Sequence, residues 1–335
     1  MTRLSIVLVL SLVGLPAARA EEVSTGIPRA LDGLAWLVGG QWNSTPVLPG
    51  GRRIEARLVA EWGPGRMSIR MRTFMRSGGR DVQTYESLLL WHPHRRRIET
   101  VTFAPGGAVH RGTGSVDHRA LTLEQSASGG FPPMRQVFAP GAEDPNRYVG
   151  KTFFRRGEEW TEVVSAVSTR TKIGSLGPPA EVSEKARSRL EPVVRLTESM
   201  WTLRPAREEA AEDCVLVAEA SLRGTLLVLT RRPALTRRPD VLSVTWWDAG
   251  RKALRSIRCD AAGGVAEGAF TIDAEEGRWT RRSTLLEVGE KTCELEEVFL
   301  RASPDRFELR ERVRADADAE WAPRSGPWLV VRREK

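Results

Sequence analysis

Apolar and polar residues alternate with a period of two along short runs through most of this 335-residue chain. The run at 53–62 reads RIEARLVAEW, and the run at 66–76 reads RMSIRMRTFMR. In the second run, every second residue from the first methionine is apolar or threonine, and arginine occupies most of the intervening positions. Such alternation is typical of half-buried antiparallel strands, because neighbouring side chains point to opposite faces.

Similar runs recur in both halves of the chain and are separated by Pro-Gly and Gly-Gly turns. The clearest helix candidates are short and lie at 28–38 and 182–196. About eight to ten short strands in roughly 150 residues are typical of a closed barrel, since closure leaves no strand edge exposed. The sequence therefore predicts an all-β protein of two tandem antiparallel up-and-down β-barrels, each opened by a short helix. A two-sheet β-sandwich is the alternative.

One long segment occurs twice without a gap. The stretch at 91–117, WHPHRRRIETVTFAPGGAVHRGTGSVD, matches the stretch at 247–273, WDAGRKALRSIRCDAAGGVAEGAFTID, at a constant offset of 156 residues. Upstream, 31–42 matches 190–201 at an offset of 159. The matched positions hold aromatic, aliphatic and glycine residues, which pack and turn. One domain type is therefore used twice.

Three of the four histidines lie in the first copy of this segment and have no counterpart in the second. The positions of His92, His94 and His110 are taken there by Asp248, Gly250 and Ala266. The segment is therefore expected to be scaffold, with His92-Pro93-His94 in a solvated hairpin turn. A functional site unique to the first copy remains open.

The first twenty residues have the pattern of a secretory signal peptide. A positive Arg3 precedes a short apolar run at 4–15, and Ala18-Arg19-Ala20 resembles a cleavage site. The expected organisation is a signal peptide at 1–20, a first barrel at 21–172, a Gly/Pro linker at 173–188 and a second barrel at 189–335. We expect a periplasmic or secreted protein with no membrane span, and two barrels with few contacts between them.

The opening LAWLVGGQW is similar to the start of lipocalin-like, or calycin, barrels, in which a helical turn leads into a strand carrying Gly-x-Trp, here Gly40-Gln41-Trp42. The glycine-rich segment after the Trp-ended strand resembles bacterial exported proteins of unknown function that share this domain. The resemblance implies that Trp42 closes the barrel base and packs under an arginine of the last strand, either Arg170 or Arg332.

The second copy departs from the lipocalin pattern, because Ser199 and Met200 stand where the first copy has Gly40 and Gln41. Haem-binding barrels of the nitrobindin type are relatives in shape, and their proximal histidine lies near the end of the domain. Neither copy has a histidine there. The resemblance therefore implies no haem, and no cofactor is expected.

Composition and charge narrow the choice of partners only slightly. The net charge of +8 falls to +6 when Arg3 and Arg19 leave with the leader, and only six of the 51 basic residues are lysine. The excess charge is spread along the chain, so an anionic envelope surface is a candidate partner and nucleic acid is not expected. The three cysteines show no metal-binding spacing and allow at most one disulfide.

No catalytic motif is present in the sequence. A zinc site needs three or four ligands, and the two closely spaced histidines have no third ligand at a defined spacing. There is no G-x-S-x-G nucleophile motif, and APGGAVHRGTG lacks the Lys-Ser/Thr and the helix of a phosphate-binding loop. A non-enzymatic protein is therefore expected.

The methionine-rich strand is the strongest candidate for a binding surface, because thioether side chains adapt to varied apolar shapes. Its arginine face (Arg66, Arg70, Arg72 and Arg76) is expected to be a solvated exterior. The leading hypothesis is an exported protein that binds or carries a small apolar molecule inside a barrel. The candidate ligand-binding residues are Met67, Ile69, Met71, Met75, Trp42 and Trp62. The alternative is a cell-envelope scaffold whose barrels are filled and whose arginine-rich exterior contacts partners.

Overall fold

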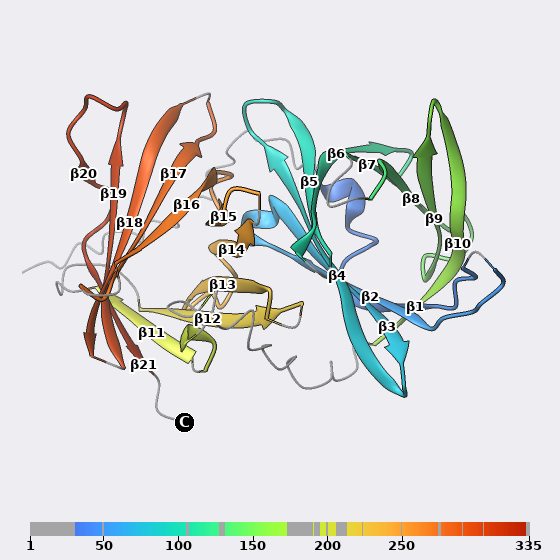
Figure 1. Ribbon diagram of the computed structural model, residues 1–335, viewed down its shortest axis with the longest axis horizontal. Coiled ribbons are helices and arrows are strands. Elements are labelled where there is room, and N and C mark those ends of the chain that lie inside the picture. The colour runs from blue at the N-terminus through green and yellow to red at the C-terminus, as the bar shows by residue number, and fades with distance from the viewer. Residues whose placement is uncertain are drawn as a thin grey trace, which may run out of the picture.

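A computed structural model describes residues 31–332 apart from positions 49, 105–106, 127–130, 173–189, 191–194, 199, 206–212, 223, 249, 274–275, 290 and 304. The leader and the linker expected from the sequence lie outside the described residues. The described chain is mostly β-strand and forms two barrels side by side, coloured blue to green and yellow to red in Figure 1. The predicted all-β fold of two tandem antiparallel barrels is confirmed, and the β-sandwich alternative is excluded.

The first barrel is a closed ring of ten antiparallel strands. Each strand pairs with its neighbours in sequence, and β1 pairs with β10 to close the ring. The strands are β1 (Gly40–Ser44), β2 (Ala56–Trp62), β3 (Ser68–Ser77), β4 (Arg80–His92), β5 (Arg97–Phe103), β6 (Val109–Asp117), β7 (Ala120–Gln125), β8 (Met134–Pro140), β9 (Arg147–Arg156) and β10 (Glu159–Thr171).

The second barrel is closed by the pairing of β18 with β19, and β20 pairs with the same edge of β19 as β21 does. The strands are β11 (Met200–Pro205), β12 (Cys214–Ser221), β13 (Leu226–Pro233), β14 (Val241–Asp248), β15 (Ala253–Asp260), β16 (Val265–Asp273), β17 (Arg278–Leu286), β18 (Thr292–Ser303), β19 (Arg306–Arg314), β20 (Ala322–Pro323) and β21 (Trp328–Arg332). Both barrels therefore follow the expected up-and-down order.

The first helical element is shorter than the sequence suggested, and most of the helix expected at 182–196 lies outside the described residues. Single 3-10 turns, η1 (Asp32–Leu34) and η4 (Arg195–Glu198), precede the first strands of the two barrels, and η2 (Pro64–Arg66) joins β2 to β3. In the described residues, the helix expected at 28–38 is therefore reduced to η1 and the turns after it. No described helix is long and apolar enough to span a membrane.

The two copies of the internal repeat also pair their strands in the same register. Ile98 pairs with Gly114 in the first barrel, and their counterparts Leu254 and Phe270 pair in the second. A Cβ atom at Gly112 would lie 1.8 Å from a carbonyl oxygen of the adjacent strand, and one at its counterpart Gly268 would lie 1.9 Å from the equivalent oxygen. Only glycine fits at this position in either copy.

The two barrels share one apolar cluster, carried largely by β4 and β5 of the first barrel and β13, β14 and β15 of the second, which face each other near the centre of Figure 1. The first barrel contributes Leu88, Leu90, Val101, Phe103 and Val109, and the second contributes their counterparts Val244, Trp246, Ile257, Cys259 and Val265 together with Leu222, Leu226, Val228 and Leu242. The barrels therefore pack through the same face, as two subunits do across a two-fold axis. The expectation of few contacts between the copies is wrong, because both faces of these strands carry apolar residues.

Two equivalent residues meet at this boundary. Arg111 and Glu267 are separated by the repeat offset of 156, and the Arg111 guanidinium donates two hydrogen bonds of 3.0 and 2.7 Å to the Glu267 carboxylate. The same guanidinium lies 5.8 Å from the ring centre of Trp246. Equivalent residues can touch only near the axis that relates the two copies, so this pair marks its position.

The arginine face predicted at 66–76 is solvated only in part, since Arg66 and Arg76 are exposed as expected and Arg70 and Arg72 are not. Arg70 and Arg72 do point away from the barrel interior, but the second barrel covers them and both are buried. Arg70 donates to Glu86 at 2.7 Å and to Glu219 of the second barrel at 2.8 Å, and Arg72 also binds Glu219. Ser221 of the second barrel donates to Glu86. Charged residues thus surround the apolar boundary cluster and pair across it.

The histidine turn also lies at the boundary between the barrels. A hairpin turn follows β4 as expected, but His92 is buried and accepts a hydrogen bond from the Arg95 backbone. His94 Nε2 lies 3.1 Å from the carbonyl oxygens of Glu287 and Lys291 in the second barrel. The expectation of a solvated turn is therefore wrong for His92, and His94 helps to join the copies.

Candidate functional site

A tryptophan closes one end of each barrel in the same way. Trp42 donates from its indole to the Leu37 carbonyl at 2.8 Å, and Trp201 donates to Leu196 at 2.9 Å. The Arg170 guanidinium lies 4.6 Å from the centre of the Trp42 ring, so the contact expected from the lipocalin resemblance is present. In the second barrel Arg332 pairs in register with Trp201. Any opening to the barrel interior must therefore lie at the opposite end.

Side chains inside the first barrel are partly exposed to solvent in the half that lies away from Trp42. Gln136 and Phe138 of β8 and Thr152 of β9 share a face, through register, with the core residues Leu121 and Leu123. All three side chains nevertheless remain partly exposed. Inward-facing side chains keep solvent contact only where a barrel is not filled, so we infer that solvent enters this half of the first barrel, which we call its open half.

The open half has a mixed apolar and neutral polar lining. Strand register directs Met75, Tyr85, Met134, Gln136, Phe138, Thr152, Phe154 and Val164 inward, and each is partly exposed. Such a mixture is typical of sites for small molecules, where apolar side chains supply contact area and a few polar groups orient the ligand.

Charge is almost absent from this interior. Apart from exposed residues at strand ends, Arg170 is the only Lys, Arg, Asp or Glu that register directs inward in the described part of the first barrel. It is held against Trp42 at the closed end. Burial raises the pKa of Tyr85, and it raises the pKa of Tyr148 to about 12 despite a hydrogen bond with Ser168. Both phenols are therefore neutral near neutral pH.

A buried polar wall faces the interior from β4 to β7. Ser87 and Thr102 share a hydrogen bond of 2.8 Å, and the Gln125 amide donates to Thr102 at 2.6 Å and to Thr100 at 3.2 Å. The Gln125 carbonyl oxygen and His110 Nδ1 are buried and make no hydrogen bond within the described chain. Like the rest of the lining, this wall carries no Lys, Arg, Asp or Glu side chain in the described residues.

The interior of the second barrel is filled by an apolar core near Trp201 and by paired charged residues in its other half. Arg258 binds both Glu297 and Glu311 at 2.6 Å, and Arg281 binds Glu297 and Ser243. The inward positions that are partly exposed in the first barrel (Gln136, Phe138 and Thr152) correspond by register to Glu297, Phe299 and Glu311, which are at most 5% exposed. The two copies therefore share a fold but differ inside.

The structure separates the six candidate ligand-binding residues into three groups. Trp42, Ile69 and Met71 lie in the packed core near the closed end of the first barrel. Met75 lies in the open half. Trp62 packs at the edge of the core, and Met67 precedes β3 rather than belonging to it.

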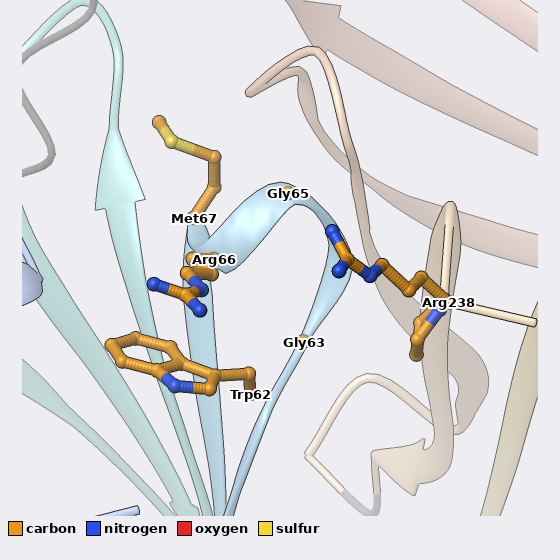
Figure 2. A pocket seen from close by; sticks show the side chains of 7 residues that line it. Trp62, Gly63, Gly65, Arg66, Met67 and Arg238 are labelled. Atoms are coloured by element: carbon orange, nitrogen blue, oxygen red, sulfur yellow. The ribbon is translucent and has the colours of Figure 1, made fainter. Parts of the chain in front are cut away.

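Trp62 and Met67 border a cavity of about 600 Å³ between the two barrels. The other lining residues are Gly63, Gly65 and Arg66 of the first barrel and Arg238 and Pro239 of the second. In Figure 2 the Arg66 side chain lies over the Trp62 ring, and Arg238 extends towards the Gly65 turn. None of its described lining residues belongs to the open half of the first barrel. Another cavity, of about 640 Å³, borders β1 and β2 near the open end.

The two methionines of β3 are expected to respond differently to truncation. Met71 is only 3% exposed within the core, so Met71→Ala should lower the unfolding free energy by about 2–5 kcal/mol. Met75 already contacts open space, so the loss from Met75→Ala should be below about 1 kcal/mol. Denaturant unfolding of both variants measures these two losses of unfolding free energy. Equal losses would mean that the two halves of the barrel are packed alike.

The described residues form neither a metal-binding cluster nor a disulfide. No three His, Cys, Asp or Glu side chains there lie close enough to hold a metal ion. No disulfide joins Cys214, Cys259 and Cys293. Burial raises the pKa of the Cys259 thiol to about 12, and its Sγ lies 3.3 Å from Ser68 Oγ across the boundary between the barrels. Cys259 is therefore a packing residue.

Comparison with known proteins identifies no family. No family model matches the chain, and no curated protein matches it. Among solved structures, it is similar to a protein of unknown function of the DUF3598 family from Nostoc punctiforme, with 11% identity over 91% of this chain and 99% of that one and a TM-score of 0.23. Kievitone hydratase from Nectria haematococca is 8% identical over 88% and 89%, with a TM-score of 0.15. Transferrin-binding protein B from Haemophilus parasuis is 8% identical over 88% and 76%, with a TM-score of 0.18. Superpositions this poor support no functional argument.

Proposed function

We propose that this is an exported, non-enzymatic protein that binds a small uncharged molecule in the open half of its first barrel. The ligand has an apolar body, which contacts Met75, Met134 and Phe138, and a polar group that hydrogen-bonds to Gln136 or Thr152. The observation that carries the proposal is the partial exposure of Gln136, Phe138 and Thr152, whose counterparts in the second barrel are buried.

The lining selects against a charged ligand. A carboxylate or ammonium group brought into this interior would lose its hydration without meeting an opposite charge, and that loss is costly. In the second barrel, the buried arginines and glutamates are already paired with one another. This barrel has a supporting role. It binds the first barrel through the shared apolar cluster and positions it.

Binding of the neutral fluorophore N-phenyl-1-naphthylamine to the intact protein tests the proposal. We expect saturable binding of one molecule per chain, with increased fluorescence. Thr152→Trp should weaken this binding at least about tenfold, because the indole occupies the open space, and tenfold corresponds to only about 1.4 kcal/mol of binding free energy. Gln136→Trp should act in the same way.

Val149→Trp is the matched control. Val149 lies on the same strand as Thr152 but points outward and is exposed, so binding of the fluorophore should be unchanged. No saturable binding to the parent protein, or equal weakening by Val149→Trp and Thr152→Trp, would reject the first barrel as the binding site. The scaffold alternative would then be favoured.

A further inference from the structure

The cavity between the barrels has a chemistry opposite to that of the first barrel's interior. Among the described residues its lining carries two arginines, Arg66 from the first barrel and Arg238 from the second, and no acidic residue. The other lining residues are an indole, a thioether, glycines and a proline. The volume of about 600 Å³ is within the range of small-molecule sites.

The two arginines differ from others along the barrel boundary in having no acidic partner. In the described part of the chain, neither guanidinium forms an ion pair or a hydrogen bond, whereas Arg70, Arg72 and Arg111 are all paired. Two guanidinium groups that border one cavity without a counter-charge create a positive potential there. An anion entering the cavity would be attracted by both.

Nearby carboxylates are already occupied by other arginines. Glu61 binds Arg72, and Asp240 binds Arg231. Asp260 binds Arg324 at 3.3 Å and accepts backbone hydrogen bonds from the turn that follows it. These acids do not line the cavity, so they leave its positive charge uncompensated.

The backbone that forms the cavity is held in an unusual conformation. Gly65 has a φ of +56°, and a Cβ atom there would lie 2.4 Å from the Ala261 carbonyl oxygen of the second barrel. Arg66, a non-glycine residue, also has a positive φ of +58°. Close contact with the second barrel therefore fixes the turn that places Arg66 over Trp62 at 5.7 Å from the ring centre.

We propose that this inter-barrel cavity binds a small organic anion, a carboxylate attached to a flat apolar group. Arg66 and Arg238 bind the carboxylate from the two barrels, since guanidinium groups match the geometry of carboxylate oxygens. Trp62 and Met67 contact the apolar part. The site is distinct from the interior of the first barrel and does not depend on ligand binding there.

Titration calorimetry with 2-naphthoate, and with uncharged 2-naphthol as the comparison, tests the site on the intact protein. We expect saturable binding of 2-naphthoate that weakens with added salt, and at least about fivefold weaker binding of 2-naphthol. Arg66→Asn and Arg238→Ala should each weaken 2-naphthoate binding at least about fivefold, because each removes one charged contact. Asparagine is chosen at Arg66 because it tolerates a positive φ.

Arg96→Asn is the control, since Arg96 is another exposed turn arginine with a positive φ, of +49°, and does not line the cavity. It should leave 2-naphthoate binding unchanged, as should Thr152→Trp. Three results would overturn the proposal: no saturable binding, equal binding of the two probes, or binding that survives both arginine substitutions. Loss of 2-naphthoate binding in Thr152→Trp alone would also overturn it, because the anion would then be bound in the barrel interior.

Discussion

Arg258→Met should lower the unfolding free energy of the protein by about 3–5 kcal/mol, the cost of leaving a buried charge without its partner. Arg258 is 4% exposed inside the second barrel and binds Glu297 and Glu311. Methionine is similar in length but supplies neither charge nor hydrogen bond. Glu311 would keep the more distant Arg231, at 3.8 Å, and a long hydrogen bond from Ser325. Denaturant unfolding at neutral pH measures the loss.

Acid titration of stability gives a second measurement of the same substitution. Burial by itself would raise the pKa of Glu311, but the charges of Arg258, Arg231 and Arg324 and the hydrogen bond from Arg258 outweigh it and hold the pKa at about 2. A carboxylate with a lowered folded-state pKa stabilises the protein above its unfolded-state pKa of about 4.5, and this contribution is lost as the pH falls towards 2. Without Arg258 the loss should begin at higher pH.

Arg310→Met is the matched control, because Arg310 pairs with Glu308 on the exposed surface of β19. An exposed ion pair contributes at most about 1 kcal/mol, so the control should change stability by less than that. Equal effects of Arg310→Met and Arg258→Met would show that the interior of the second barrel is hydrated and that its charges do not depend on one another.

Phe103→Asp should destabilise the joint between the barrels by more than about 4 kcal/mol, because it places an unpaired carboxylate in an apolar cluster. Phe103 is 1% exposed, and its ring centre lies 5.2 Å from that of Trp246 in the second barrel. The parent protein should unfold in one cooperative transition, since the shared cluster couples the barrels. The variant should unfold in two transitions, measured by calorimetry.

Phe153→Asp is the control for this change. Phe153 lies on β9 of the first barrel, points outward and is partly exposed, so its replacement should cost less than about 1.5 kcal/mol and keep a single transition. Two separate transitions in the parent protein would contradict the coupling of the barrels, and so would a single unchanged transition in Phe103→Asp.

The alternation of residues in β3 was enough to predict which side chains face the barrel interior. Ile69 and Met71 point into the core and Arg70 and Arg72 point out of it, as expected. Alternation does not say what covers the outer face, and the arginines were therefore wrongly expected to be solvated. A signal was present in the run Leu88-Leu89-Leu90, since three consecutive apolar residues in a strand indicate burial on both faces.

The candidate site was less predictable than the fold. Gln136 and Thr152 are neutral polar residues in alternating strands, and nothing in their local sequence separates an inward position from a solvated one. The charges inside the second barrel, such as Glu297 and Arg281, resemble surface residues for the same reason. Their position follows from strand register, which links residues far apart in sequence and which the alternation pattern does not specify.

The contact between Arg111 and Glu267 shows what covalent fusion permits. In a dimer of identical chains, residues at equivalent positions beside the axis are identical, so an arginine there would face a second arginine. Here the partners are encoded separately and have acquired opposite signs, which makes each half complementary to the other half rather than to itself. Because both copies belong to one chain, they are always present in a one-to-one ratio. Their interiors can therefore diverge, so that one keeps open space and the other holds buried ion pairs.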